Sequence, residues 1–126
     1  MEKYEIGLKK KSFSLFFNGG EIWCEHLDSL YKEKELLLKK FNQDLVQISK
    51  PSTTSFIALN LDQSDVDRDI MEYIINSFIR LEKPLRKVAF IGLTSKMKSY
   101  VKKRNMDTSF IMACINDFEK AKEWLI

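Results

Sequence analysis

The stretch Phe56-Ile-Ala-Leu-Asn-Leu61 decides the fold, because it is short, largely apolar and free of charge. Strands that are covered on both faces of a parallel sheet have this composition. A second stretch of the same kind, Val88-Ala-Phe-Ile-Gly-Leu93, follows after a segment with helical periodicity. Strands that alternate with helices in this way predict a mainly parallel sheet, whose right-handed crossovers place the helices on its faces.

The segment between these two strands has the pattern of an amphipathic helix. Ile70, Ile74 and Phe78 recur at four-residue steps, and further apolar residues lie beside them. The acidic, turn-forming residues 62–67 precede the helix, and either Asp65 or Asp67 can cap its first turn. The segment therefore predicts a helix with a broad apolar face, as expected for a helix that packs on a sheet.

The C-terminal part repeats the same alternation. Thr94 or Ser95 can cap a short helix after the predicted strand at residues 88–93. Residues 110–115 predict a further strand. Asn116, with Glu119 three residues later, has the spacing of a capping box and predicts the start of a last helix.

The N-terminal third predicts a hairpin followed by a long helix. Two runs alternate between apolar and polar residues, as half-buried strands do. Their apolar members are Tyr4, Ile6 and Leu8 in the first run, and Phe13, Leu15 and Phe17 in the second. We expect a basic turn at residues 9–11, an end of the second strand at residues 18–20, and a helix from Glu21 or Glu25 to Phe41. Residues 45–48 either extend this helix or pack separately.

The predicted order is therefore β-β-α-β-α-β-α-β-α in a single α/β domain of residues 1–126, with a mixed, mainly parallel sheet, an N-terminal hairpin and about four helices. A chain of 126 residues has the length of an ordinary domain. Hydrophobic residues make up 44% and charged residues 31%, which suits one core and a soluble surface.

This order of elements, at this length, resembles the STAS domain, the fold of bacterial anti-sigma-factor antagonists and of the cytoplasmic regulatory domain of sulfate transporters. Residues 56–62 resemble the central strand of that family, residues 88–95 its next strand and helix cap, and residues 116–125 its closing helix. The resemblance implies a STAS-like fold and a bacterial, cytoplasmic protein that regulates by binding.

The end of the chain resembles a divergent STAS-like branch related to lipid-transfer folds. That branch tends to end in a Phe, an Ala and then a Trp-Leu pair, and the matching residues here are Phe118, Ala121, Trp124 and Leu125, with a shorter gap before the alanine. This likeness implies an alternative function, the carrying or sensing of a small apolar or lipid ligand.

One family motif is missing. Anti-sigma-factor antagonists have an Asp-Ser-Ser-Gly motif after the central strand, and its serine is phosphorylated at a helix start, where the dipole acts on the added charge. The equivalent residues here, 66–71, contain no hydroxyl, and Ser64 lies several residues too early. A phosphorylation switch of the family type is therefore not expected, and the acids Asp65, Asp67 and Asp69 are predicted to cap the helix and to complement its dipole.

The sequence predicts no catalytic or metal site and no cofactor. His26 is the only histidine; on the expected helix it would point away from Cys24, and no second cluster of Cys and His completes a zinc site. Carboxylates at the end of the central strand could instead bind Mg²⁺, although capping is the favoured interpretation. Two cysteines without a CxxC pair indicate free thiols in a reducing compartment.

The charge distribution does not favour nucleic acid as a partner. The net charge is only +3, and basic residues are spread over several segments. The densest basic group surrounds Tyr100 and could bind nucleic acid or an anionic lipid surface, but the outer face of an amphipathic helix explains it equally well. No apolar run approaches the roughly 20 residues that a membrane span needs, and we expect no secretory signal.

Our leading prediction is a non-catalytic regulatory or adaptor domain that binds another protein. Ligands in open α/β sheets bind outside the carboxyl ends of strands at a topological switch point. The candidate binding residues at the ends of the two central strands are Asp62, Ser64, Asp65, Asp67, Asp69, Thr94 and Ser95. An exposed face on the N-terminal hairpin would also permit a homodimer.

Overall fold

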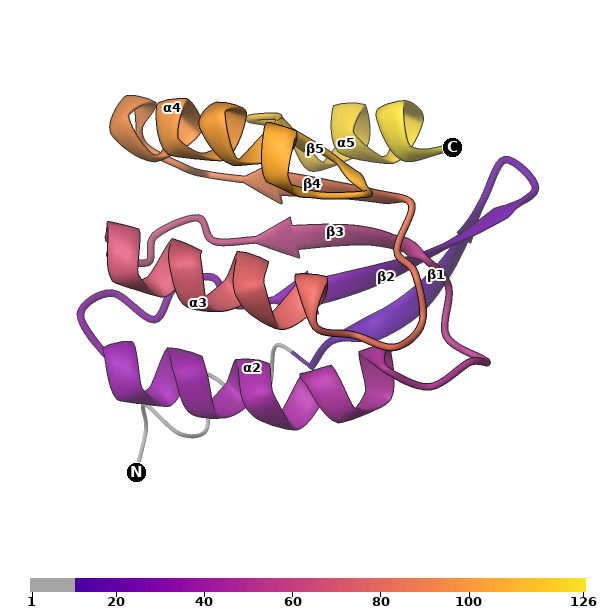
Figure 1. Cartoon of the computed structure of the whole chain (residues 1–126), viewed down its shortest axis with the longest axis horizontal. Helices are drawn as coiled ribbons and strands as arrows, with labels where there is room; N and C mark the ends of the chain where they lie inside the picture. The colour runs from indigo at the N-terminus through magenta and orange to yellow at the C-terminus, as the bar shows by residue number, and fades with distance from the viewer. Residues whose placement is uncertain (1–10) are drawn as a thin grey trace.

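The computed structural model describes residues 11–126, which form one mixed sheet with helices on both faces (Figure 1). Its strands are β1 (Phe13–Phe17), β2 (Gly20–His26), β3 (Phe56–Asn60), β4 (Lys87–Ile91) and β5 (Ile111–Cys114), and they lie in the order β1-β2-β3-β4-β5. β1 pairs antiparallel with β2, and every other pairing is parallel. The predicted mainly parallel sheet with an N-terminal hairpin is confirmed.

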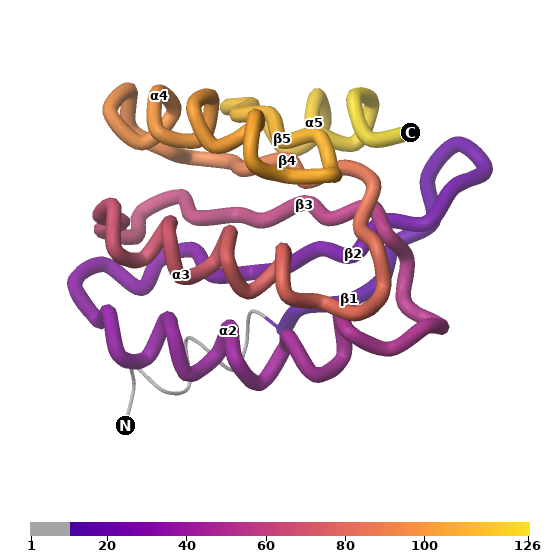
Figure 2. Tube along the Cα trace, in the orientation of Figure 1, coloured from indigo at the N-terminus to yellow at the C-terminus, as the bar shows by residue number. Residues whose placement is uncertain are grey.

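Three crossover helices cover one face of the sheet, and one helix covers the other. α2 (Lys34–Ile48), α3 (Arg68–Ile79) and α4 (Ser95–Arg104) run side by side across the same face (Figures 1 and 2). A 3₁₀ turn (Asn105–Asp107) follows α4, and α5 (Phe118–Leu125) packs against β3 and β4 from the opposite side. The described residues follow the order β-β-α-β-α-β-α-β-α, and from residue 34 onward each strand and α-helix lies where one was predicted.

The two faces differ in side-chain size. In the strand register, one row facing α2 to α4 contains Trp23, Ile57, Val88 and Met112. The neighbouring row on the opposite face contains Cys24, Ala58, Ala89 and Ala113. Because these residues are small, α5 can lie close to the sheet and bury Ala121 against it.

The first hairpin differs from the prediction. Asn18 and Gly19 both have positive φ, of 48° and 82°, as in the tight two-residue turn that Asn-Gly favours between antiparallel strands. Residues 20–26 are therefore strand β2, and the predicted helix start at Glu21 or Glu25 is wrong. Because β2 lies between β1 and β3 and is covered on both faces, it lacks the alternation of a half-buried strand. The predicted strand with Tyr4, Ile6 and Leu8 lies outside the described residues.

The first helix also begins later than predicted. Leu27 and Leu30 have helical spacing, but both lie in the loop before α2, where they are buried in the core. The helix itself continues through residues 45–48, so that the alternative of an extended helix is correct. Within residues 11–126, no helix is long and apolar enough to cross a membrane.

The strand order shows no reversal. β2 to β5 follow one another across the sheet, and the crossovers between them all lie on one face. The expected switch point, at which the order turns back and opens a crevice, is therefore absent from the described sheet. The loops after β3 and β4 nevertheless meet at one edge of the sheet, because parallel strands end on the same side.

Candidate functional site

The loops that follow β3 and β4 pack backbone against backbone. Gly92 has a φ of +84°, and a Cβ atom there would lie 2.6 Å from the Cα of Asp62. Only glycine tolerates both the left-handed conformation and this close approach. This contact fixes the position of residues 92–95 relative to residues 62–67, as the prediction of one shared surface required.

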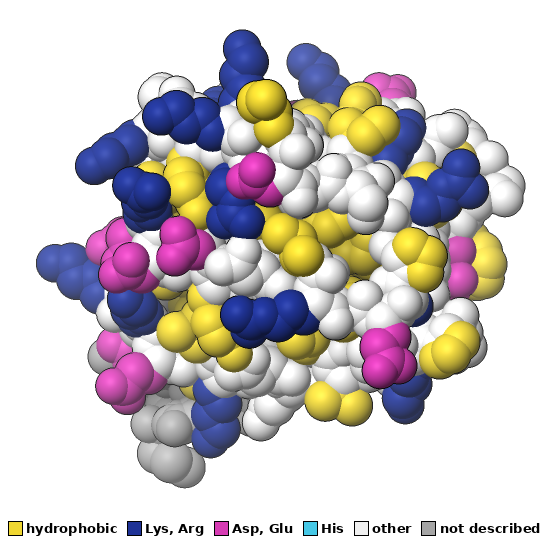
Figure 3. Space-filling model, in the orientation of Figure 1, with side chains coloured by type: hydrophobic (Ala, Val, Ile, Leu, Met, Phe, Trp, Pro, Cys, Tyr) yellow, Lys and Arg dark blue, Asp and Glu magenta, His cyan; other side chains and the backbone are white. Residues whose placement is uncertain are grey.

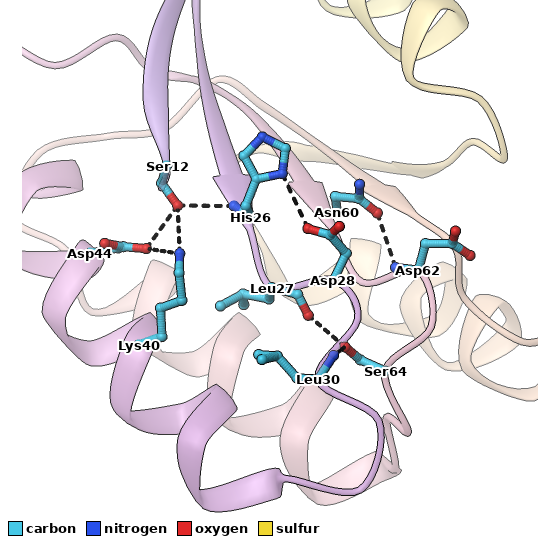
Figure 4. Close-up of polar contacts among 10 residues, drawn as sticks. All are labelled: Ser12, His26, Leu27, Asp28, Leu30, Lys40, Asp44, Asn60, Asp62 and Ser64. Carbon is cyan, nitrogen blue, oxygen red and sulfur yellow. Dashed lines mark hydrogen bonds and ion pairs between the residues drawn. The ribbon is translucent and has the colours of Figure 1, made fainter. Parts of the chain in front are cut away.

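Ser64 fastens the same loop to the loop after β2. Its hydroxyl donates to the carbonyl of Leu27 at 2.6 Å and accepts from the amide of Leu30 at 3.1 Å (Figure 4). A parallel bridge between Tyr31 and Ser64 continues the pairing of β2 with β3. The half-buried hydroxyl is thus engaged in loop packing, which gives Ser64 a structural role in this conformation.

Asp67 and Thr94 cap α3 and α4, the two helices that follow these loops. Asp67 Oδ1 accepts from the amide of Ile70 at 2.9 Å, and Thr94 Oγ1 accepts from the amide of Met97 at 3.3 Å. The hydrogen bond from Ile70 and the charge of Lys34 lower the pKa of Asp67. Of the predicted alternatives, Asp67 rather than Asp65 caps α3, and Thr94 rather than Ser95 caps α4. At α5, the cap is Asp117 and not Asn116.

A cleft of about 590 Å³ lies between α3 and α4, and we refer to it as the α3–α4 cleft. It is lined by Val66, Asp67, Arg68, Thr94, Lys96, Met97, Ser99, Tyr100, Lys103, Arg104 and Asp107. Of the seven predicted binding residues, the structure brings Asp67 and Thr94 into this lining. Asp62, Ser64, Asp65, Asp69 and Ser95 are on the same loops and helix starts but do not line the cleft.

The wall of the cleft on α4 is held by a network around Tyr100. Arg104 donates to the Tyr100 hydroxyl at 2.9 Å, to Asn76 on α3 at 2.7 Å and to Asp107 at 2.9 Å. The Arg68 guanidinium lies over the Tyr100 ring at 5.3 Å, within the range of a cation–π contact. These contacts tie the start of α3 to the middle of α4 and the second half of α3 to the end of α4, and they shape the cleft between the two helices.

The cleft contains more positive charge than its own acids neutralise. Asp107 pairs with Arg104, and Asp67 lies 3.5 Å from Lys34. Among residues 11–126, Arg68, Lys96 and Lys103 have no ion-pair partner. Lys and Arg side chains gather over α4 in the upper left of Figure 3, beside acids over the start of α3. The basic group around Tyr100 was recognised in the sequence, but its partner Arg68 on α3 was not.

A second polar group lies under α2 and consists of Ser12, Glu25, Lys40 and Asp44; we call it the buried polar cluster. Asp44 Oδ2 accepts from Ser12 at 2.8 Å and from Lys40 at 3.0 Å (Figure 4). Glu25 is completely buried, and its Oε1 accepts from the indole of Trp23 at 2.9 Å. This cluster connects β1, β2 and α2.

The fold shifts the pKa values of the two acids of the buried polar cluster in opposite directions. Burial and the neighbouring Asp44 raise the pKa of Glu25 well above its usual value. Burial opposes ionisation of Asp44 as well, but hydrogen bonds from Glu25, Lys40 and Ser12 outweigh it and lower the pKa of Asp44. Glu25 Oε2 is buried without a hydrogen-bond partner among residues 11–126, so that a negative charge there would be uncompensated and burial favours the neutral form of Glu25.

His26 and the two thiols are placed in structural roles. Cys24 and His26 lie on β2 and not on a helix, so that they point to the same face and not in different directions. His26 Nδ1 lies 3.2 Å from Asp28 (Figure 4). The His26 ring also stacks on Phe13, with the ring centroids 5.7 Å apart. Burial raises the pKa of Cys24 and of Cys114 to about 11, which disfavours the reactive thiolates. The described residues contain no group of three ligands that could hold a metal ion.

Comparisons with known proteins identify the fold. The sequence matches no protein-family model and no curated protein. A solved structure of an uncharacterized protein of the DUF3478 family with a SpoIIAA-like fold, from Shewanella loihica PV-4, is similar over 92% of this chain and 93% of its own, with a TM-score of 0.59 and 15% sequence identity. The chain therefore has a SpoIIAA-like, that is, a STAS-like, fold, as the element order predicted.

Proposed function

We propose that this chain is a non-catalytic regulatory or adaptor domain that binds another protein through the surface formed by the α3–α4 cleft and the loops after β3 and β4. The observation that supports it most is the combination of a fixed backbone with unpaired charge on this surface. Gly92, Ser64 and the two helix caps hold the loops in place. A preorganised surface loses less entropy on binding than a mobile one.

The chemistry of the described residues favours binding over catalysis. Nucleophilic catalysis needs a nucleophile within hydrogen-bond reach of a base. The half-buried Ser12 hydroxyl donates to the carboxylate of Asp44, whose lowered pKa makes it a weak base, and the imidazole of His26 contacts Asp28. Both thiols are disfavoured as thiolates. These contacts support a domain without enzymatic activity.

The alternative of an apolar-ligand carrier receives less support from the same surface. Pockets for such ligands are lined predominantly by hydrophobic and aromatic side chains. The α3–α4 cleft has Val66, Met97 and Tyr100 as its less polar members, and its other lining side chains are polar or charged. A shallower hollow on the outer side of α2 also mixes Leu38 and Val46 with polar residues.

The proposal is tested by affinity capture with matched charge reversals. The variant Lys96→Glu changes the cleft, whereas Lys120→Glu changes an exposed lysine on α5, on the opposite face of the sheet. We expect the wild type and Lys120→Glu to capture the same specific protein, and Lys96→Glu to capture much less of it. Equal capture by all three proteins, or no specific capture by the wild type, would refute the proposed binding surface.

A further inference from the structure

We infer that the segment bound in the α3–α4 cleft is an acidic stretch of the partner protein, with carboxylate side chains that pair with Arg68, Lys96 and Lys103. This inference rests on the proposed function and adds the chemistry of the partner. Its starting point is the charge of α4, which contains five basic residues and no acid. The cleft that α4 forms with α3 is lined by four basic and two acidic side chains.

Of the four cations that line the cleft, one is held by neighbouring side chains, and three have no ion pair among residues 11–126. Arg104 is held by Asp107, Asn76 and Tyr100, so that it forms part of the wall. Arg68, Lys96 and Lys103 are exposed and have no ion pair among residues 11–126. Since Asp67 and Asp107 already have cationic partners, the unpaired charges of the lining are positive and complement an acidic ligand. The nearby Glu72 carboxylate, outside the lining, accepts a hydrogen bond from the Tyr100 hydroxyl at 3.3 Å.

Arg68 lies against the Tyr100 ring with its guanidinium 5.3 Å from the ring centroid. The Tyr100 ring lies under its guanidinium, which limits the conformations of an otherwise exposed side chain. A guanidinium that stacks on a ring can still use its planar N–H groups for a bidentate contact with a carboxylate. Lys96 and Lys103 extend the positive surface along α4, one near its first turn and one near its last.

The same geometry disfavours nucleic acid as the ligand. Single-stranded nucleic acids bind along basic grooves in which aromatic rings stack on successive bases. Tyr100 is the aromatic residue of the lining, and its ring already lies beside two guanidinium groups, of Arg68 at 5.3 Å and Arg104 at 5.9 Å. A cleft of about 590 Å³ also fits a few side chains better than a continuous nucleic-acid strand.

The test is an NMR titration of the full chain with two short acetylated peptides, one of alternating Glu and Gly and one in which Gln replaces each Glu. We expect the Glu peptide to shift the amide signals of residues 66–68 and 94–107, and the Gln peptide to leave them unchanged. In the combined variant Arg68→Gln, Lys96→Gln and Lys103→Gln, the apparent affinity for the Glu peptide should fall by about tenfold or more. The matched variant Lys102→Gln, one residue from Lys103 but outside the cleft lining, should bind like the wild type.

Several results would overturn the inference. These are equal shifts with both peptides, no shifts with either, an equal loss of affinity in Lys102→Gln, or tighter binding of a single-stranded thymidine oligonucleotide at the same amides. Because the capture experiment is independent, the two proposals can fail separately. Capture that depends on Lys96 without binding of the Glu peptide refutes the acidic segment alone. Cleft-dependent peptide binding together with capture that ignores Lys96 refutes the proposed function.

Discussion

The α3–α4 cleft and the buried polar cluster contain similar residue types but use them differently. In the buried polar cluster, Lys40 and Ser12 donate to Asp44 inside the fold, near the buried Glu25, whose pKa is raised. In the cleft, Arg104 and Asp107 satisfy each other, while Arg68, Lys96 and Lys103 stay exposed without an ion pair among residues 11–126. Charges compensated within the fold support stability, whereas exposed cations without an ion pair are available to a ligand.

The largest effect is expected where the cleft depends on backbone packing. In Gly92→Ala, the new Cβ would lie 2.6 Å from the Cα of Asp62 at a φ of +84°. We expect a loss of about 3 kcal/mol in the free energy of unfolding, measured with urea. Gly19→Ala is the control, because Gly19 has a similar φ of +82° but no neighbour within 4 Å. It should lose only about 1 kcal/mol, and equal losses would argue against the loop contact.

The second-largest effect on stability is expected when an acid of the buried polar cluster, rather than an acid of the cleft, is removed. Asp44→Ala removes the acceptor of Lys40 and Ser12, whose amine and hydroxyl are partly buried. We expect a loss of about 2 kcal/mol in unfolding free energy. Asp107→Ala removes an equivalent acid from Arg104 in the cleft, where Asp107 is 59% exposed, and should lose about 0.5 kcal/mol. If the two variants lose the same amount, the contrast between the regions is wrong.

The pH dependence of stability tests the raised pKa of Glu25. The pKa of Glu25 is raised above 4.5 in the fold. The contribution of neutral Glu25 to the free energy of unfolding is therefore complete at low pH, and it is lost as the pH rises from 4.5 through the folded pKa. Asp44 affects stability in a lower pH range. Because its pKa is lowered in the fold, the stability that its ionised form contributes is lost only as the pH falls below 3.8. Glu25→Gln should therefore gain stability relative to the wild type between about pH 4 and about pH 8. A constant difference across this range would exclude a protonated Glu25.

The smallest effect on stability is expected in the cleft itself. The combined variant Arg68→Gln, Lys96→Gln and Lys103→Gln changes exposed side chains without ion pairs among the described residues. Its unfolding free energy should stay within about 0.5 kcal/mol of the wild type. Urea unfolding checks this expectation, and a loss above about 2 kcal/mol would show that these cations stabilise the fold.

The sequence predicted correctly those helices and strands whose residue pattern reflects their burial in the fold. The strands near Phe56 and Val88 are apolar because both of their faces are covered, and a strand that ends before a capping residue leads into a helix. The prediction failed at residues 20–26, because a strand covered on both faces lacks alternation. The Asn18-Gly19 pair was the available signal for that hairpin, and its positive φ values show how it forms the turn.

The candidate site was predicted less completely than the fold. Asp67 and Thr94 were found because capping is local in sequence. The contribution of Arg68 depends on its contact with Tyr100, 32 positions later, and on the packing of α3 beside α4. The raised pKa of Glu25 likewise depends on the contact of β2 with Asp44 on α2. Contacts between distant segments have no local signal in a single sequence.

Site-specific photo-crosslinking in cells tests the central claim most directly. A photoreactive residue replaces Ser99, which is exposed and lines the α3–α4 cleft, or Lys120 on α5 as the control. We expect a specific protein adduct from position 99, and we expect it to disappear when Arg68, Lys96 and Lys103 are each replaced by Glu. Position 120 should give no such adduct. An adduct from position 120 alone, equal adducts from both positions, or none from position 99 would contradict a protein-binding surface at the α3–α4 cleft.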